Sequence, residues 1–377
     1  MQALRAESFA EAERLFLAAT AHDKAASALW RNVATARRAQ RDDAGELQAL
    51  NAAIDVDRRD FMGWLRKAEL HQRIGEEAEA LAAWSGVLQL AAQASDLPPE
   101  IDAALQVGRT FVSEAGARVA EAVETELAPL QETMDETQLR RSSAFVDLAI
   151  GRRRAFFNQC EGLYYPFLPA DEYFDRRHFS WMSDIEAVTA DIRRELESLL
   201  ADPGDALRPY VRMDKGIPQN KWSGLDQSLD WSACFLWEYG EPNQPVLDRC
   251  PNTAMALAAL PSAHIPRRSP SAFFSILKPH TRIPPHTGVT NTRAIVHLPL
   301  IVPPHCGFRV GGETREWHVG EAFAFDDTIE HEAWNDSDEF RAVLIFDVWN
   351  PHLSTIEQTL ITRYFDAADK TGFNPAR

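Results

Sequence analysis

The stretch 284-PPHTGVTNTRAIVHLPL-300 joins a turn signal, a histidine and a run with strand character. Its two prolines and its glycine are typical of a turn, and the apolar residues that follow favour a β-strand. His286 stands between the two, two residues before Gly288. A common iron-binding pattern needs a carboxylate at the place of that glycine. The stretch is therefore either a metal site that lacks one ligand or a histidine in a turn before a strand.

Further runs with strand character flank this stretch and are separated from one another by proline and glycine. They are WSACFLWEYG, SAFFSILKP, GFRVGG, TREWHVG, EAFAFDD, HEAWND and FRAVLIFDVW. Many short strands with turn signals between them predict a β-sandwich or barrel. One amphipathic helix is expected before them at 183–201, with Ser183 as its N-cap.

The N-terminal part of the chain has a different composition. Residues 1–95 are rich in Ala, Leu, Glu and Arg, contain no proline, and match themselves at an offset of 34. The matching pairs are Trp30 and Trp64, Ala34 and Ala68, Ala44 and Ala78, Leu47 and Leu81, Leu50 and Trp84, and Ile54 and Leu88. A 34-residue period of paired helices is the tetratricopeptide signature, and an Ala-rich bundle with accidental matches is the alternative. We expect these repeats to pack on a further helix near 99–125 and to bind a protein partner.

These patterns predict an α+β multidomain protein. We expect a tetratricopeptide-like helical repeat domain over 1–125, a helical connector over 126–154 and a β domain over 155–377.

Composition narrows the possible partners and locations. The net charge of −17 argues against nucleic acid, whose binding needs a concentrated basic face. No apolar run approaches the ~20 residues of a membrane span, and the amphipathic start of the chain is unlike a secretory signal. The four scattered cysteines favour a reducing, cytoplasmic setting, with a single disulfide as the alternative.

Three polar side chains stand out within the predicted strands. His331 follows His286 by 45 residues, and Arg341 begins a strand ten residues later. Because a strand exposes alternate residues on one face, Arg341 shares a side with Asp347, and Arg293 shares one with His297. If these strands line one barrel, its interior offers imidazoles for a metal and a guanidinium for a distal carboxylate.

At this point the sequence resembles a known family. From about 155 to 354 the chain is similar to the aspartyl/asparaginyl β-hydroxylases, which are Fe(II)- and 2-oxoglutarate-dependent dioxygenases. The similarity is carried, in this order, by SILKP, PPHTGVTNTR, HLPLIVP, GETREWHVGEAFAFDDTIEHEAWN and FRAVLIFDVWNP. It implies a double-stranded β-helix, or jelly roll, and a helical-repeat segment before the catalytic domain also occurs in that family.

The resemblance also implies how the missing ligand is explained. The family carries glycine where Gly288 stands, so His286 and His331 alone are expected to hold Fe(II), with 2-oxoglutarate and waters completing the sphere. Asp327 matches the carboxylate that holds a water beside the metal. The other histidines, at 280, 305, 318 and 352, are expected not to be ligands.

For the cosubstrate, the resemblance places Ser275 and Arg341 on the distal carboxylate of 2-oxoglutarate and His297 near its other carboxylate. Arg293 matches an arginine that we expect to face an acidic group of the substrate. Ile295 departs from the family, because the mammalian hydroxylase has another arginine there.

The implied reaction uses O2 and 2-oxoglutarate to hydroxylate an unactivated C–H bond. The family's usual target is the β-carbon of an Asp or Asn residue in a peptide or protein. A free amino acid derivative or a lipid acyl chain is an alternative substrate. Two other classes of protein also stay open: an interaction protein with an inactive jelly roll, and a metal cupin of another reaction type, such as an isomerase, which Arg341 disfavours.

Overall fold

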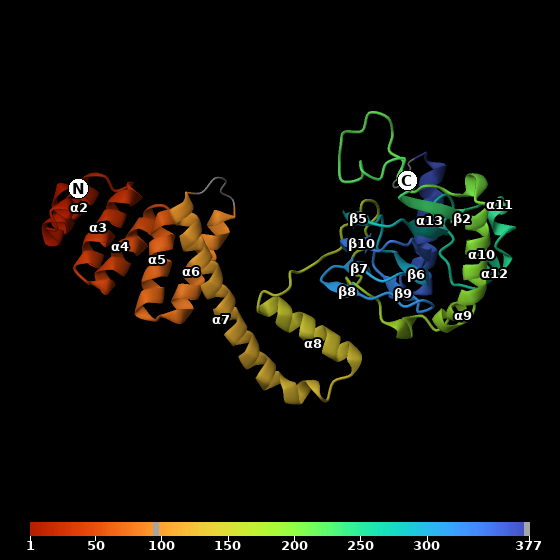
Figure 1. Ribbon diagram of the computed structural model, residues 1–377, viewed down its shortest axis with the longest axis horizontal. Helices are drawn as coiled ribbons and strands as arrows, with labels where there is room; N and C mark the ends of the chain where they lie inside the picture. The colour runs from red at the N-terminus through yellow and green to blue at the C-terminus, as the bar shows by residue number, and fades with distance from the viewer. Residues whose placement is uncertain (93–97, 373–377) are drawn as a thin grey trace. The chain divides into compact units, whose positions relative to one another are not determined.

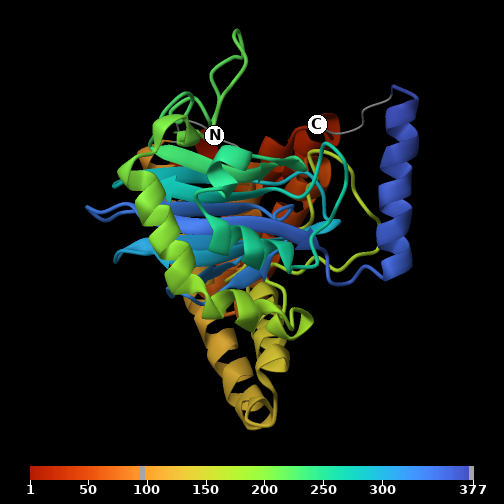
Figure 2. The ribbon, with the colours of Figure 1, turned by 90° about the vertical axis from the view of Figure 1, so that its right-hand side faces the viewer.

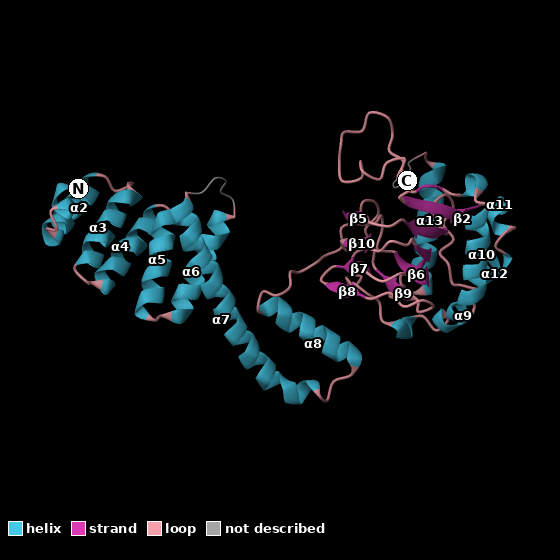
Figure 3. Cartoon of the chain, in the orientation of Figure 1, coloured by secondary structure: helices cyan, strands magenta, loops and turns pink. Residues whose placement is uncertain are grey.

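The computed structural model describes residues 1–92 and 98–372, and the chain divides into two compact units, Met1–Arg152 and Arg153–Arg377 (Figure 1). The last residues of the expected 155–377 domain lie outside the described part. The expected boundary at 125 falls inside a helix, because α7 runs over Pro99–Gln131. The first unit is helical and the second contains the antiparallel sheets (Figure 3), so an α+β multidomain chain is confirmed.

The first unit is a row of helices in which consecutive helices pack on each other. Its helices are α1 (Gln2–Arg5), α2 (Phe9–His22), α3 (Ser27–Ala39), α4 (Asp43–Val56), α5 (Phe61–Ile74), α6 (Glu77–Ala91), α7 and α8 (Glu136–Ala149). The offset of 34 carries α3 onto α5 and α4 onto α6. Ala34 and Ala68, which match at this offset, are both fully buried, as are Leu50 and Trp84.

The further helix expected near 99–125 is present as α7. It packs closely on α6, because a Cβ atom on Gly108 would lie 2.3 Å from the ring of Trp84. The absence of a side chain at Gly108 is therefore what lets the two helices approach. Nowhere in the described ranges 1–92 and 98–372 does a helix have the length and apolar character that crossing a membrane requires.

The second unit contains two antiparallel sheets. Its strands are β1 (Arg208–Pro209), β2 (Trp231–Glu238), β3 (Glu241–Pro242), β4 (Ala272–Leu277), β5 (Thr281–His286), β6 (Arg293–Ile301), β7 (Cys306–Val310), β8 (Glu313–Arg315), β9 (Phe323–Phe325), β10 (His331–Asn335) and β11 (Arg341–Trp349). In the described residues the larger sheet has the order β1-β2-β4-β11-β6-β9, with β3 beside β2, and the smaller has the order β5-β10-β7-β8.

One core lies between the two sheets and a second lies behind the larger sheet. The first joins Leu277 and Val343 of the larger sheet to Ile283 and Phe308 of the smaller. The second packs the other face of the larger sheet against helices (Figure 2), as in the contact of α10 with β6. The helices of this unit are η1 (Arg176–His178), α9 (Met182–Ala187), α10 (Thr189–Ala201), η2 (Gly204–Ala206), α11 (Gln244–Leu247), α12 (Pro251–Ala258) and α13 (Thr355–Lys370).

Two local expectations were wrong. The helix expected at 183–201 is broken at Val188 into α9 and α10, and Ser183 lies inside α9 instead of capping it. Tertiary contacts hold the end of α9, since the Glu186 carboxylate accepts hydrogen bonds from Arg176 and from the backbone N–H of Ala322. Secondly, His286 ends a strand, β5, where a turn was expected. The two prolines of β5 are tolerated because this strand lies at the edge of the smaller sheet.

Candidate active site

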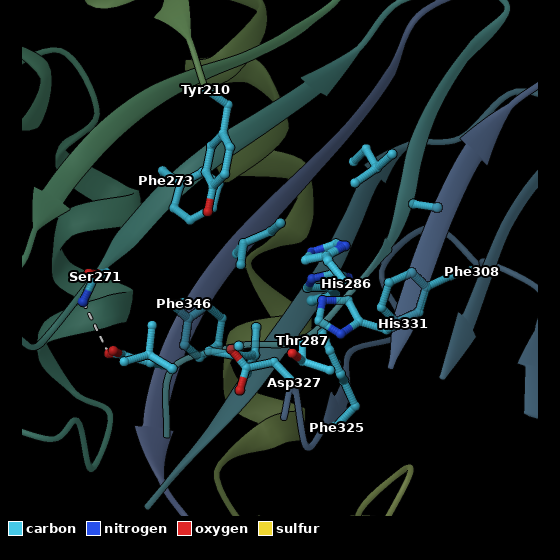
Figure 4. A pocket seen from close by; sticks show the side chains of 18 of the residues that line it. Tyr210, Ser271, Phe273, His286, Thr287, Phe308, Phe325, Asp327, His331 and Phe346 are labelled. Atoms are coloured by element: carbon cyan, nitrogen blue, oxygen red, sulfur yellow. Dashed lines mark hydrogen bonds between the residues drawn. The ribbon is translucent and has the colours of Figure 1, made fainter. Parts of the chain in front are cut away.

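A cavity of about 300 Å³ lies between the two sheets (Figure 4). Its lining includes most of the residues singled out from the sequence, namely His286, Arg293, Ile295, His297, Asp327, His331 and Arg341. Ser275 is fully buried behind the lining and contacts Arg341. The structure therefore brings all the expected site residues to one cavity or directly behind it, from five different strands and one loop.

His286 and His331 form a pair because their strands are neighbours. They are cross-strand partners in the ladder of β5 and β10, and their ring centroids are 4.0 Å apart. The Nδ1 atom of His286 lies 2.8 Å from the carbonyl oxygen of Pro284, and that of His331 lies 3.0 Å from the carbonyl oxygen of Ile329. A carbonyl oxygen can only accept, so each Nδ1 carries the proton and each Nε2 keeps its lone pair.

Burial keeps both rings neutral. It lowers the pKa of His286 to about 4, and it lowers the pKa of His331 well below the ordinary value, with neighbouring His286 adding to the effect. Two neutral imidazoles, each fixed through Nδ1 by a backbone carbonyl, are the arrangement that histidine ligands of a metal adopt. The pair fits a divalent transition metal such as iron.

Asp327 occupies the space beside Gly288. The N–H of Gly288 donates to the Asp327 carbonyl oxygen at 2.6 Å, and a Cβ atom on Gly288 would lie 2.0 Å from the Asp327 Oδ2 atom. Burial, and after it the neighbouring Asp326 carboxylate, raise the pKa of Asp327 to about 7. Within the described parts of the chain, no group of three or more His, Cys, Asp or Glu side chains could hold a metal. Because the Asp327 carboxylate fills the space where a Cβ atom would lie, residue 288 has to be a glycine.

Arg341 is a buried cation at another position along the cavity. It is 1% exposed, lies under the Trp317 ring with 5.0 Å to the centroid, and donates through Nη2 to Ser275 Oγ at 3.4 Å. Its Nε atom has no partner in the described residues, and no carboxylate pairs with it there. Burial lowers the pKa of Arg341 to about 10. A buried guanidinium without a counter-ion is a ready site for the carboxylate of a ligand.

His297 lies among aromatic rings near the same cation. It stacks on Trp317 at 5.5 Å between centroids and is close to Phe308 and Phe325. Burial and the Arg341 charge lower its pKa well below the ordinary value. Its Nδ1 atom has no hydrogen-bond partner in the described residues. The ring is therefore a neutral polar group, with hydrogen-bonding capacity left for a ligand.

Arg293 already has a carboxylate from its own chain. It forms an ion pair with Asp347, whose side chain is 1% exposed, and it donates to the carbonyl oxygen of Arg268 at 3.2 Å. Asp347 also accepts from Ser269 Oγ at 3.0 Å and from the N–H of Ser271 at 3.1 Å (Figure 4). Burial raises the pKa of Asp347, and Arg293 opposes the shift. The expectation that Arg293 faces an acidic substrate group stays a prediction, and the pair with Asp347 was not foreseen.

Residues 186–351, which contain most of this cavity's lining, match the family model of aspartyl/asparaginyl β-hydroxylase. This part of the chain is similar to that family. The human aspartyl/asparaginyl β-hydroxylase is 35% identical over 178 residues, which is 46% of this chain and 23% of that protein. The ornithine lipid ester-linked acyl 2-hydroxylase of Rhizobium tropici is 32% identical over 181 residues, which is 47% of this chain and 60% of that protein.

The chain thus spans from about a quarter to three fifths of the length of these relatives. Among solved structures, the type III secretion translocator chaperone SycD of Yersinia enterocolitica covers 31% of this chain and 78% of its own, with 16% identity and a TM-score of 0.27. A score this low does not establish a shared fold.

The cavity also has lining residues that the sequence did not reveal. Tyr210 stacks on Trp231 with 4.0 Å between centroids and lies 5.3 Å from Phe273, and Trp222 lies 5.0 Å from the His286 ring. Tyr210 and Trp222 come from a segment between α10 and β2 that has no strand or helix pattern. Tyr210 and Trp222 are the only aromatic residues of that segment, 202–230, so its composition gave no signal for a cavity wall.

The other histidines of the second unit and its cysteines do not line the cavity. His280 pairs with Asp338 and His352 with Asp171, and none of the histidines at 280, 305, 318 and 352 lines the cavity. The four cysteines, all in the described part, are free thiols.

Proposed function

We propose that the second unit is an Fe(II)- and 2-oxoglutarate-dependent dioxygenase that hydroxylates an unactivated C–H bond. One observation carries the proposal. A single cavity holds two neutral imidazoles with free Nε2 atoms and a buried guanidinium with no carboxylate of its own. A metal and a ligand with two acidic ends would satisfy these groups together.

The residues would divide the binding between them. The Nε2 atoms of His286 and His331 would hold Fe(II), and Arg341 with Ser275 would bind the distal carboxylate of 2-oxoglutarate. His297 would hydrogen-bond near the other carboxylate. The bound iron and 2-oxoglutarate together supply the chemistry that uses O2 to hydroxylate the substrate, with succinate and CO2 as co-products.

Asp327 would act beside the metal without being a ligand. In three-ligand sites a carboxylate stands two residues after the first histidine, where this chain has Gly288. The Asp327 carboxylate reaches that place from the other side, so we assign it the role of holding a water there. Its raised pKa lets it exchange a proton with that water near neutral pH.

We further propose the finer architecture. The two facing antiparallel sheets are those of a double-stranded β-helix, and the row of helices before them consists of tetratricopeptide-type repeats. The 34-residue offset between equivalent helices supports the second assignment, and such repeats would bind a protein partner. A cytoplasmic location stays a prediction.

The substrate is the least determined part. The expected target is the β-carbon of an Asp or Asn residue in a peptide, as the name of the human relative suggests, while the bacterial relative is named for an acyl chain. A free amino acid derivative is a third possibility. The inactive-domain alternative has no observation in its favour, because His297 Nδ1 and Arg341 Nε in the cavity have no hydrogen-bond partner among the described residues. The isomerase alternative does not account for Arg341.

The test is to measure succinate formation from 2-oxoglutarate with Fe(II) and O2, with and without candidate substrates, and to look for the mass gain of one oxygen atom. Anaerobic titration of the Fe(II) protein with 2-oxoglutarate, followed by the charge-transfer band of the chelate, tests cosubstrate binding separately. A protein that binds Fe(II) but never gives this band, at any 2-oxoglutarate concentration, would contradict the proposal.

A further inference from the structure

We infer that the substrate half of the cavity receives an uncharged, apolar group, and that Asp347 determines this by occupying Arg293. The inference deepens the proposed function and rests on it. It names both a specificity-determining residue and the chemical class of the group that is hydroxylated.

The ion pair of Arg293 and Asp347 is built into the domain. Asp347 is fixed by hydrogen bonds from Ser269 Oγ and Ser271 N–H in addition to Arg293, and it is almost fully buried. These three donors leave the Asp347 carboxylate little freedom to turn away. An acidic substrate group at Arg293 would have to share that cation with Asp347, whose buried carboxylate already neutralises the guanidinium and would repel a second negative charge.

No other cation that lines the cavity can bind an acidic substrate group in place of Arg293. Among the described lining residues the basic side chains are Arg293 and Arg341. Arg341 and Asp347 are six residues apart on β11, which separates their backbones by about 20 Å along the strand. Arg341 is therefore reserved for the cosubstrate, and the opening near Asp347 has no spare positive charge.

The arginines around that opening are also paired. Arg267 and Arg268 bind Asp369 of α13, and Arg208 binds Glu238 of β2. Ile295 is opposite Asp347 in the ladder of β6 and β11, so the cross-strand neighbour of that carboxylate is apolar. Lys221 near His286 is bound to the Pro285 carbonyl oxygen, and the arginines named here are held by carboxylates of the chain. No unpaired guanidinium among these residues is left near Asp347 to attract a carboxylate.

The walls of the substrate half are apolar. The Tyr210 ring lies near Phe273 (Figure 4) and stacks on Trp231, and the Trp222 ring is 5.0 Å from that of His286. Ile295 and Ile345 continue this surface on the larger sheet. Flat aromatic rings and branched aliphatic side chains bind an acyl chain or an apolar amino-acid side chain by burying its surface.

Four probes separate charge from apolar character. The N-acetyl methylamides of Asp and Asn have nearly the same shape and differ in charge, that of Leu adds apolar surface, and N-methyloctanamide represents an acyl chain. Their affinities are measured by calorimetry on the full chain, once without metal and once with Fe(II) and 2-oxoglutarate under anaerobic conditions. The metal-free measurement does not depend on the proposed chemistry, so the two proposals can fail separately.

We expect the Asn probe to bind more tightly than the Asp probe by on the order of tenfold, and the best apolar probe to bind more tightly than both. Preference for the Leu probe would indicate an amino-acid side chain, and preference for N-methyloctanamide an acyl chain. If the Asp probe bound as well as the apolar probes, or if no probe bound, the inference would be overturned.

Variants test the role of Asp347 directly. Asp347→Asn keeps the shape and an acceptor for Ser271 but frees the Arg293 charge, so it should improve binding of the Asp probe by about tenfold. Adding Arg293→Gln should cancel that gain. Asp338→Asn, which removes an exposed acid paired with His280, is the control and should change nothing. An unchanged ratio of Asp to Asn affinity in a folded Asp347→Asn protein would refute the assigned role.

Discussion

Replacing Arg341 with methionine should strongly weaken 2-oxoglutarate binding without destabilising the protein. Burial lowers the pKa of Arg341 from its ordinary value of 12.5 to about 10. At neutral pH the charged form is therefore less favourable in the folded chain by roughly 3 kcal/mol. This penalty is present at all pH values below the folded pKa and is relieved only as the pH rises through it. Met fills similar space without the charge, so it removes the penalty.

Some stabilising contacts are lost as well. These are the contact with the Trp317 ring and the long hydrogen bond to Ser275, which together contribute about 1–3 kcal/mol. The free energy of unfolding of the ligand-free Arg341→Met protein should then equal or exceed that of the wild type. Binding of the cosubstrate should weaken by at least roughly 30-fold, because truncating one partner of a buried charge pair costs about 2–5 kcal/mol.

Thermal unfolding with and without 2-oxoglutarate, in the anaerobic Fe(II) protein, separates the two effects. A hundredfold excess over Kd stabilises the wild type by about 2.7 kcal/mol, or roughly 5–10 °C in Tm for a domain of this size. Arg341→Met should show no such rise, and Arg341→Lys only part of it, since an ammonium cannot reproduce the bidentate fork. A variant that unfolds much earlier than the wild type without ligand, or that is stabilised equally by 2-oxoglutarate, would refute the reasoning.

Three further outcomes are expected. Replacing either His286 or His331 with Ala should remove Fe(II) binding in an anaerobic titration, while His280→Ala should bind iron normally; full iron affinity in either single variant would disprove the two-ligand site. Gly288→Ala should lower Tm, because the new Cβ atom would lie 2.0 Å from Asp327 Oδ2. Adding Asp327→Gly in the same chain should restore the Tm. If the double variant is not restored, the contact between the Cβ atom and Asp327 is not the cause. In metal-free protein, the pKa of Asp327, raised from 3.8 to about 7, means that the wild type loses stability as the pH rises through 7. Asp327→Asn should lack this loss, and parallel stability curves from pH 4 to 8 would contradict the assignment.

The sequence predicted the parts of the fold that depend on local pattern. The run 340–349 became β11, because a strand that is buried on both faces has a nearly continuous apolar sequence. The 34-residue offset matched real helix pairs, because the buried positions of equivalent helices recur at that interval. The edge strand β5 was missed because its two prolines are a turn signal unless the position in the sheet is known. The break at Val188 was missed because it depends on contacts made by Glu186 with residues far along the chain.

In the candidate site, too, the features set by local pattern were predicted and those set by distant neighbours were not. Motifs brought the histidines and Arg341 to attention, and strand alternation placed Arg293 and Asp347 on inward faces. Their pairing could not be foreseen, since Ile295 is the residue opposite Asp347 and Arg293 reaches it diagonally from two positions away. Which arginine is free to bind a ligand is decided by such three-dimensional neighbours. Sequence pattern identifies charged residues but not which of them are already neutralised.

The C-terminal helix α13 lies outside the cavity but contacts the segment that holds Asp347 in place. Asp369 of this helix binds Arg268 at 2.9 and 3.0 Å, and Phe365 lies under the same guanidinium. The segment that follows Arg268 carries Ser269 and Ser271, whose hydrogen bonds fix Asp347. Selectivity can therefore be adjusted by remote engineering, at residues that never touch a substrate. Protein engineers who wish to change the selectivity of this unit could begin on the face of α13, leaving every lining residue unaltered.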